Sequence, residues 1–247
     1  QYHHASARAY SVSARAVASS GIAQADAEPR ESDEQGAHLS INAVELRCAM
    51  AAVAPVVQPI ARMQTTWTVH ADGSLALQMD VERDTEFPFL PRFGIRMMLP
   101  RAMRNVVYCG YGPGESYVDK HRACWHGMFE GTPPTLGERE IRPQENGNRH
   151  DCDWASVAGD GVALIVLRGD GVQPARAFDF QAIDYTAEEM TRAAHDFELE
   201  PAGATVVSVD YMQSGIGSNS CGPELLPQYR LDAPEFRFAV TLRPQSA

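Results

Sequence analysis

Residues 142–149 combine a carboxylate and three amides around one glycine, in the order Arg-Pro-Gln-Glu-Asn-Gly-Asn-Arg. Glu145 and Asn146 offer hydrogen-bond acceptors and donors to neighbouring hydroxyl groups of a sugar, while an aromatic ring such as Trp154 would stack on the C–H face. The same two side chains could instead tie two loops of the protein together. Asn146-Gly147 fits a turn with positive φ, so we expect a loop at this place.

A second polar loop, at residues 215–223, reads Gly-Ile-Gly-Ser-Asn-Ser-Cys-Gly-Pro. Ser218, Asn219 and Ser220 are small polar residues between glycines, which allows the backbone to come close to a sugar or to another domain. Cys221 would act as a nucleophile only beside a base, and the sequence supplies none. The spacing fails the Gly-x-Ser-x-Gly elbow, which excludes that hydrolase arrangement.

A third polar segment, residues 110–122, begins Gly-Tyr-Gly-Pro-Gly and follows an apolar run. It lacks the Gly-Lys-Ser/Thr ending of a phosphate-binding loop. We expect a tight turn in which the glycines take positive φ, and two carboxylates near an arginine, because a buried carboxylate needs a cationic partner. A structural role is therefore predicted for Gly112, Pro113, Glu115, Tyr117, Asp119 and Arg122, and for Gly147 of the first segment.

Metal and disulfide chemistry are not expected. The five cysteines are odd in number and never at Cys-x-x-Cys spacing, which is typical of reduced cytosolic thiols. Zinc needs clustered ligands, and none are visible along the chain. His121, His126 and His150 lie in loop-like segments, where a lone histidine is more often a satisfied residue than a catalyst.

The composition of the chain excludes two classes of binding partner. The 247 residues carry a formal net charge of -11, which argues against nucleic acid and against an anionic membrane surface. No apolar run approaches the roughly 20 residues of a membrane span, and no signal peptide opens the chain. We therefore expect a cytoplasmic protein. The chain begins at Gln1 without Met, so we expect a piece of a longer protein.

The elements that must position these loops are strands. Apolar residues alternate with polar ones at 75–81, after a run at 65–69 and an Asp-Gly turn, which predicts a hairpin. Further strands are expected at 95–99, at 106–109 before the glycine-rich turn, and at 178–180 and 236–242. The continuous apolar run at 163–167 predicts a strand buried on both faces.

One short helix is predicted, because Thr186 and Glu189 form a capping box ahead of Met190, Ala193 and Ala194. It should fade near Phe197. The acidic segment 24–37 predicts a solvated loop joining two strands as a long hairpin. No linker divides the chain, so residues 1–247 are expected to form one domain.

The three polar segments together resemble the C-terminal "small chain" domain, also called domain 5, of the family 2 beta-galactosidases. The resemblance is best from about Pro91 to Leu242. It implies an all-β fold: a large antiparallel β-sandwich, or supersandwich, of the galactose mutarotase-like type. The family domain starts earlier, so the opening strands would be missing and an exposed edge or apolar face is expected.

The resemblance also implies roles for residues. The loop at 215–223 would line the entrance to the galactose pocket of a barrel domain, with Ser218, Asn219, Ser220 and Cys221 as candidate substrate contacts beside Glu145 and Asn146. Some members carry a Trp about where Cys221 stands, and it stacks on the substrate. The motifs that bear the family's two catalytic glutamates have no counterpart in this chain, so no catalytic residue is expected.

The first hypothesis is thus a non-catalytic domain that packs on the catalytic barrel of a beta-galactosidase. The parent would hydrolyse terminal β-galactosides such as lactose with retention, through a glutamate pair about 5–5.5 Å apart. The resemblance implies a homo-oligomer whose magnesium and sodium ions are bound mainly by other domains. Alternatives are a stand-alone mutarotase-like aldose epimerase, using His121 or His150 with Glu145, and a carbohydrate-binding module.

Overall fold

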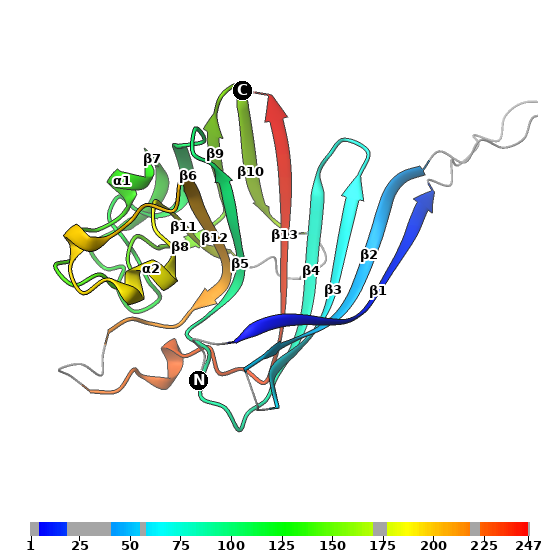
Figure 1. Cartoon of the computed structure of the whole chain (residues 1–247), viewed down its shortest axis with the longest axis horizontal. Coiled ribbons are helices and arrows are strands. Elements are labelled where there is room, and N and C mark those ends of the chain that lie inside the picture. Colours follow the sequence, from blue (N-terminus) through cyan, green and yellow to red (C-terminus); the bar gives the residue numbers. More distant parts are fainter. Residues whose placement is uncertain (1–4, 19–40, 55–57, 170–176, 218–222, 247) are drawn as a thin grey trace, which may run out of the picture.

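The computed structural model of the chain describes residues 5–18, 41–54, 58–169, 177–217 and 223–246. Its strands form two sheets that face each other (Figure 1), and every pairing between named strands is antiparallel. The larger sheet, within these residues, has nine strands in the order β1 (Ser6–Ala18), β2 (Ile41–Val53), β3 (Pro59–His70), β4 (Leu75–Arg83), β13 (Glu235–Ser246), β10 (Val162–Arg168), β9 (Trp154–Gly159), β6 (Asn105–Gly112) and β7 (Trp125–Gly131). The smaller sheet orders its four described strands as β5 (Arg92–Pro100), β12 (Ala204–Gln213), β11 (Phe178–Ile183) and β8 (Arg149–Cys152). The predicted antiparallel sandwich is confirmed.

The main hydrophobic core lies between the two sheets and draws on both. Leu77, Met79 and Val81 of β4 are buried at every second position, as their alternation predicts. Phe180 of β11 and Val207 of β12 meet this face from the smaller sheet. Burial of such side chains contributes about 1.5–3 kcal/mol each, so this interface supplies most of the driving force for folding.

The strand that is buried on both faces is β11, not the apolar run at 163–167. All six residues of β11 are buried, including Asp179 and Gln181, whereas in β10 only Val166 is. β11 lies inside the smaller sheet, between β12 and β8, and its residues are buried on both faces. In β10 the residues on both sides of Val166 are only half-buried. The prediction for 163–167 was right about the strand and wrong about its burial.

The predicted hairpins are present. β3 and β4 pair around a turn in which Gly73 has φ +83°, and the Asp72 carboxylate accepts the Ser74 N–H at 2.9 Å. β1 and β2 also pair antiparallel, as expected for strands joined by the acidic segment. Residues 24–37 themselves lie outside the described part of the chain. β1 pairs only with β2 within that part, and its residues 6–17 are all exposed, so the sheet ends in an exposed edge.

The glycine-rich stretch after β6 differs from the expected turn. β6 continues through Gly110 to Gly112, which pairs with Trp125 of β7. The positive-φ glycines of the described chain are elsewhere, Gly147 among them. Gly110 is instead required by close packing, because a Cβ on it would lie 2.5 Å from the Cys152 Sγ atom.

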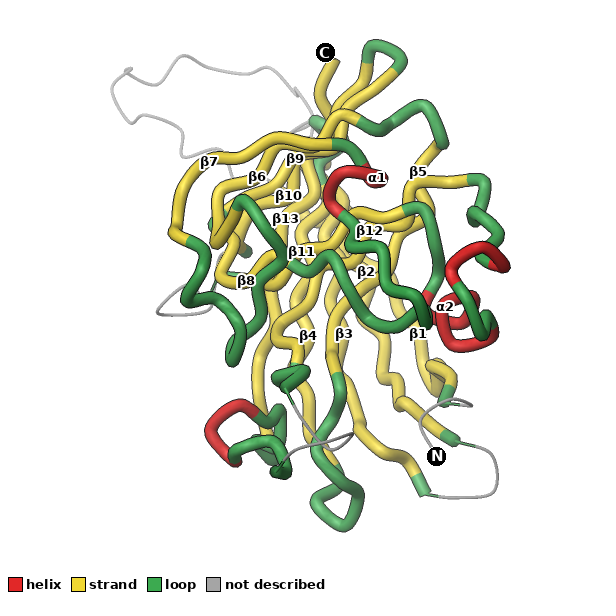
Figure 2. Tube along the Cα trace, turned by 90° about the vertical axis from the view of Figure 1, so that its left-hand side faces the viewer, coloured by secondary structure: helices red, strands yellow, loops and turns green. Residues whose placement is uncertain are grey.

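Two short helices, rather than one, occur in the described chain: α1 (Pro133–Leu136) and α2 (Ala187–Arg192), with 3-10 turns at Asp196–Glu198 and Pro227–Tyr229. The Thr186 hydroxyl accepts the Glu189 N–H as predicted, but the Glu189 carboxylate binds Arg192 instead of reaching back. Met190 and Ala193 are buried, whereas Ala194 is exposed. Figure 2 looks onto the end of the molecule where both helices and their loops lie in front of the strands. Neither helix described is long or apolar enough to cross a bilayer.

Candidate functional site

Two of the three polar segments are joined through Glu115 and Ser116. The Glu115 carboxylate accepts the Gly147 N–H at 2.8 Å, and the Ser116 N–H donates to the Asn148 carbonyl at 2.8 Å. The Asn148 amide returns a hydrogen bond to the Ser116 carbonyl at 2.9 Å. Ser116 and Asn148 are fully buried, and Gly147 has φ +76°, as the Asn-Gly pair predicts. Residues 115–116 and 147–148, far apart in sequence, are thus bonded to each other, and we call this joined part of the two segments the wall.

The third polar segment is held by Asp119. Its carboxylate accepts the N–H groups of Ile216 at 3.2 Å and of Gly217 at 2.8 Å. A Cβ on Gly215 would lie 2.5 Å from this carboxylate, so the glycine is needed for the approach. The candidate contacts Ser218, Asn219, Ser220 and Cys221 lie outside the described residues. The base of their loop is nevertheless fixed to the wall described above.

The prediction that Arg122 is the cationic partner of Glu115 and Asp119 is wrong. Arg122 is exposed, and in the described chain Glu115 forms its ion pair with Lys120. The Tyr117–Lys120 bridge turns the chain so that Lys120 returns to Glu115. Tyr117 is fully buried, which raises the pKa of its phenol, and its hydroxyl donates to Glu115 at 3.4 Å. Glu115, Tyr117, Lys120 and Gly147 therefore form one network of contacts, in which Lys120 takes the place predicted for Arg122.

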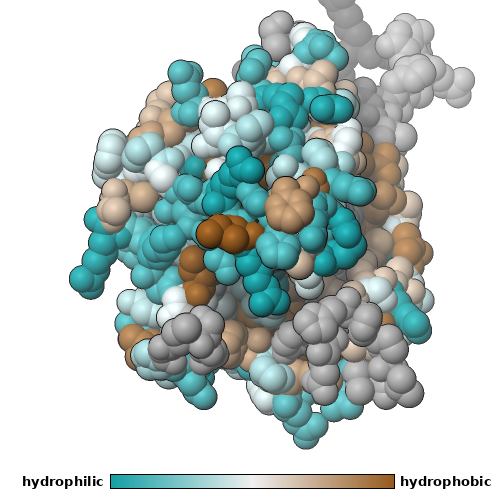
Figure 3. Space-filling model, turned by 60° about the vertical axis from the view of Figure 1, so that its left-hand side comes forward, coloured by the Kyte–Doolittle hydropathy of each residue, from teal (hydrophilic) through white to brown (hydrophobic). Residues whose placement is uncertain are grey.

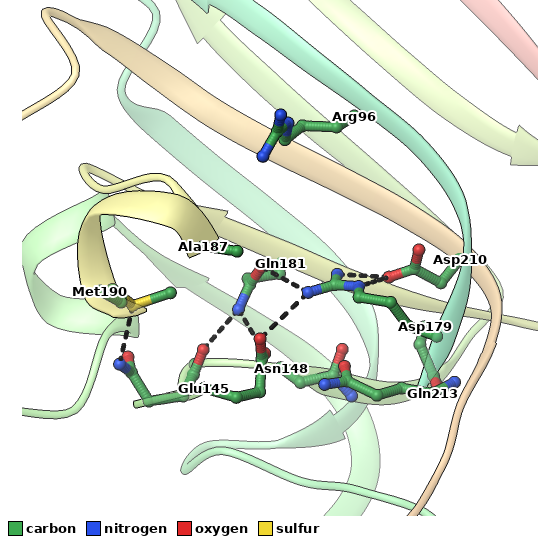
Figure 4. A network of polar contacts seen from close by, with 12 residues as sticks. Arg96, Glu145, Asn148, Asp179, Gln181, Ala187, Met190, Asp210 and Gln213 are labelled. Carbon is green, nitrogen blue, oxygen red and sulfur yellow. Dashed lines mark hydrogen bonds and ion pairs between the residues drawn. The ribbon is translucent and has the colours of Figure 1, made fainter. Parts of the chain in front are cut away.

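Glu145 and Asn146 have different surroundings. Asn146 is buried and bonded on both sides, to the Glu138 N–H and to the Gln144 carbonyl. Its amide also contacts the Met190 sulfur at 3.5 Å, which ties the loop to α2 (Figure 4). This is the loop-tying role that the sequence left open. The outer side of Asn146 lines a cavity of about 280 Å³ between α1 and the loop after α2.

Glu145 belongs to a charged network that the sequence did not predict. Arg92 of β5 pairs with Glu145 at 3.1 Å and with Asp210 of β12, and Gln181 of β11 donates to Glu145 at 2.7 Å (Figure 4). Burial raises the pKa of Asp210 to about 6, although Arg92 opposes this shift. The Asp210 attraction raises the pKa of Arg92 against the cost of burial. Strand pairing between β5, β12 and β11 brings Arg92, Asp210 and Gln181 together, and the loop before β8 adds Glu145, so the spacing of these residues in the sequence does not predict the network.

A cluster of rings lies beside the wall. His121 and His150 have centroids 5.6 Å apart, and Tyr111 lies 5.1 Å from His121. His150 Nδ1 lies 2.7 Å from the buried carboxylate of Asp179. The carboxylate found against His150 is thus Asp179, whereas the epimerase hypothesis names Glu145.

Two buried acceptors in this region lack a partner in the part of the chain described, the Asn148 Oδ1 and Gln213 Oε1 atoms. Both residues stand near Asp179 in Figure 4. Buried amide oxygens of this kind commonly hold ordered water. The outer surface of this side of the molecule is mainly hydrophilic, with separate hydrophobic side chains (Figure 3).

The sequence predicts no metal site, yet the fold gathers three ligand types at one place. Cys109, His126 and Asp153 bring their ligand atoms within 4.8 Å of one another. Cys109 and Asp153 stand 44 positions apart in the sequence. Their proximity comes from the hydrogen bond of the Asp153 N–H to the Cys109 carbonyl. The cysteines of the described chain are free, Cys221 lying outside it.

Comparison with known proteins identifies relatives over most of the chain. Residues 3–242 match the sequence model of a family described as the beta galactosidase small chain. A beta-galactosidase of Staphylococcus xylosus is 38% identical over 200 residues, which are 81% of this chain and 20% of that protein. A beta-galactosidase of Actinobacillus pleuropneumoniae is 36% identical over 205 residues, which are 82% of this chain and 19% of that protein. The chain thus spans about a fifth of the length of these relatives.

Solved structures that are similar to this chain include a galactose 1-epimerase from Lactobacillus acidophilus. It has a TM-score of 0.40 and 9% sequence identity, and the similarity covers 84% of this chain and 64% of that one. A putative aldose 1-epimerase from Escherichia coli has a TM-score of 0.36 and 13% identity, covering 84% and 67%.

Proposed function

Because this chain belongs to the beta-galactosidase small-chain family, we propose that it is the non-catalytic C-terminal part of a beta-galactosidase. In this role it packs on the catalytic barrel and contributes the loop at residues 215–223 to the galactoside pocket. The observation that carries the proposal is the pair of hydrogen bonds from Ile216 and Gly217 to Asp119. They anchor the base of the polar loop to the wall that the other two polar segments form.

The carboxylates near the site favour a supporting role over glycoside chemistry. Retaining hydrolysis needs one carboxylate free to attack and one able to donate a proton. In this chain Glu145 and Asp210 share Arg92, and Glu115 is held by Lys120 and the Gly147 N–H. A carboxylate neutralised by a fixed cation is a poor nucleophile, and Asp210, although its pKa is raised, is buried against Arg92 where a substrate cannot reach it. We therefore place the two catalytic glutamates in the barrel.

The substrate contacts proposed for this chain are hydrogen bonds from the loop. Ser218, Asn219 and Ser220 would meet the hydroxyl groups of a β-galactoside such as lactose, and Cys221 would stand where some relatives of the family carry a stacking Trp. Glu145 is half-exposed and could accept one hydroxyl, whereas Asn146 is already committed to the backbone. We further propose a cytoplasmic, homo-oligomeric parent, in keeping with the free cysteines of the described chain, with magnesium and sodium held mainly by other domains.

The experiment is hydrolysis of nitrophenyl β-galactoside by the chain alone and by the whole protein that contains it. The chain alone should show no turnover and the whole protein should. Turnover by the isolated chain that disappears on replacing one of its own carboxylates would refute the proposal. Calorimetry with galactose separates a further case, because micromolar binding by the isolated chain would indicate a carbohydrate-binding module.

A second function is favoured by one observation, the neighbouring rings of His121 and His150 with Asp179 behind His150. Opening a sugar ring needs an acid and a base, and a carboxylate that orients a histidine is a common part of such a pair. An aldose epimerase would interconvert the anomers of galactose rapidly, and His121→Gln and His150→Gln would each remove the activity. Interconversion at the uncatalysed rate excludes this function.

A further inference from the structure

Cys109, His126 and Asp153 place three different metal-ligating atoms next to one another at the edge of the larger sheet. Cys109 is on β6 and His126 on the neighbouring strand β7, where Tyr111 pairs with His126 and Cys109 with Met128. In paired strands these positions point to one face, opposite the buried Tyr108. Asp153 follows β8 and is drawn to this face by its hydrogen bond to the Cys109 carbonyl, 2.8 Å long.

The separations fit a tetrahedral cation site. The Cys109 Sγ atom lies 3.8 Å from Asp153 Oδ2, and His126 Nε2 lies 3.6 Å from the same oxygen. Zinc bonds of about 2.3 Å to sulfur and about 2.0–2.1 Å to nitrogen or oxygen, at tetrahedral angles, put ligand atoms roughly 3.3–3.6 Å apart. The third pair, the Cys109 Sγ and His126 Nε2 atoms, lies within 4.8 Å and must close around the shared Asp153 oxygen to complete the site.

The surrounding contacts orient the ligands. Arg168 of β10 binds Oδ1 of Asp153 at 3.2 Å, which turns Oδ2 toward Cys109 and His126. Such outer contacts commonly fix the rotamer of a ligating carboxylate. His126 Nε2 lies 3.2 Å from the Asp151 carbonyl, a contact in which the nitrogen must donate. Asp151 has φ 56°, a conformation that non-glycine residues seldom adopt, and this presents its carbonyl to the site.

We propose that Cys109, His126 and Asp153 bind a thiophilic divalent cation, with Zn²⁺ as the natural occupant and the fourth position left to water. Thiolate selects zinc over magnesium or calcium, and three protein ligands leave one position open. On binding, the S–H bond of Cys109 breaks, its proton goes to solvent and a metal–sulfur bond forms. The His126 ring changes to the tautomer with its proton on Nδ1, so the Nε2 hydrogen bond to the Asp151 carbonyl is lost and a metal–nitrogen bond forms. The cation fastens β7, which pairs only with β6 in the described chain, to the segment between β8 and β9. This proposal is independent of the role in galactoside hydrolysis.

The test is a titration of the purified, metal-free full chain with Co²⁺, which reports its own coordination. One cobalt ion per chain should bind and give a thiolate-to-cobalt charge-transfer band together with the intense visible bands of tetrahedral cobalt. Zn²⁺ should displace the cobalt and raise the melting temperature of the chain. Failure to bind cobalt in a one-to-one ratio, or binding without the charge-transfer band, overturns the proposal.

Matched variants assign the ligands. Cys109→Ser should abolish the charge-transfer band, and His126→Gln and Asp153→Asn should each weaken cobalt binding by more than about tenfold. His126 is exposed, so its replacement leaves folding intact even if another variant does not fold. Cys48→Ser and His70→Gln, on the distant strands β2 and β3, should bind cobalt as the unaltered chain does. Unchanged binding in His126→Gln, or loss in either control, overturns the assignment.

Discussion

The Asp119 carboxylate accepts the Gly217 N–H at 2.8 Å, across 98 positions of the chain. This contact, with the second one to Ile216, fixes the base of the polar loop at residues 215–223. The distance between the two partners in sequence makes the contact a tertiary one, so its loss should act on the loop without breaking any strand. It is therefore the place at which the proposed role of the loop can be separated from the stability of the sandwich.

Replacing Asp119 by Ala removes a charged acceptor from two backbone N–H groups. We expect the free energy of unfolding to fall by about 1.5–3 kcal/mol, measured by urea denaturation. In the whole enzyme, kcat/KM for nitrophenyl β-galactoside should fall as well, because the loop is no longer held. Asp232→Ala, which alters an exposed carboxylate, is the control. Equal effects of the two changes would show that Asp119 does not anchor the loop.

Glu115 offers a pair of variants that separate its ion pair from its backbone contact. Glu115→Gln keeps an acceptor for the Gly147 N–H and loses the charge opposite Lys120, whose side chain is 56% exposed. The Glu115 side chain is 8% exposed, but the lysine end of the pair is solvated, so the ion pair should contribute about 1 kcal/mol and this variant should stay close to the parent in stability. Glu115→Ala loses both of these contacts and the hydrogen bond from the Tyr117 hydroxyl, and should cost about 1.5–3 kcal/mol in urea unfolding. The interpretation fails if the Gln variant is as unstable as the Ala variant.

Gly110 and Gly114 lie four positions apart and should respond differently to a methyl group. A Cβ on Gly110 would lie 2.5 Å from the Cys152 Sγ atom and 3.1 Å from its Cα, whereas a Cβ on Gly114 has no atom within 4 Å. Gly110→Ala should therefore lower stability by about 1–3 kcal/mol, because the core is overpacked. Gly114→Ala should change it by less than about 0.5 kcal/mol. Thermal melts of both variants check this, and a neutral Gly110→Ala would contradict the close packing of Gly110 on Cys152.

Asp210 should make the stability depend on pH in a defined window. Its pKa is raised from 3.8 to about 6 in the folded chain. As the pH rises, the carboxyl therefore ionises in the unfolded chain before it does so in the folded chain, and this favours unfolding. The protonated Asp210 thus contributes about 3 kcal/mol to the free energy of unfolding below about pH 4, and this contribution is lost by about pH 6. In Asp210→Asn the free energy of unfolding should fall less over this window than in the parent. Parallel pH curves of the two proteins, from urea unfolding at each pH, would contradict the raised pKa.

Much of the fold is predictable from the chain, because local patterns decide it. Alternation at 75–81 and the Asp72-Gly73 turn give the β3–β4 hairpin directly. Burial on both faces is different, since it depends on which strand lies in the middle of the smaller sheet. β11 contains Asp179 and Gln181 and looks half-polar, yet it is buried because Gln213, Glu145 and His150 satisfy these side chains.

The polar segments that form the site could be predicted from the sequence, but the contacts between their residues could not. The segments at 110–122, 142–149 and 215–223 could be chosen by residue type, and the structure brings all three together. The choice of Lys120 over Arg122 depends on a backbone turn that sequence spacing does not encode. The Cys109, His126 and Asp153 cluster depends on strand register in the same way.

The central claim is that this chain serves a galactoside pocket through its loop and performs no chemistry itself. The most direct measurement is kcat/KM of the whole enzyme carrying Asn219→Ala, beside Cys221→Trp, with the melting temperature of each variant. We predict that Asn219→Ala lowers kcat/KM by about 2- to 13-fold, the effect of one lost hydrogen bond of about 0.5–1.5 kcal/mol, at unchanged stability. Cys221→Trp should tighten substrate binding through stacking. Unchanged kinetics in both variants at unchanged stability would contradict the claim.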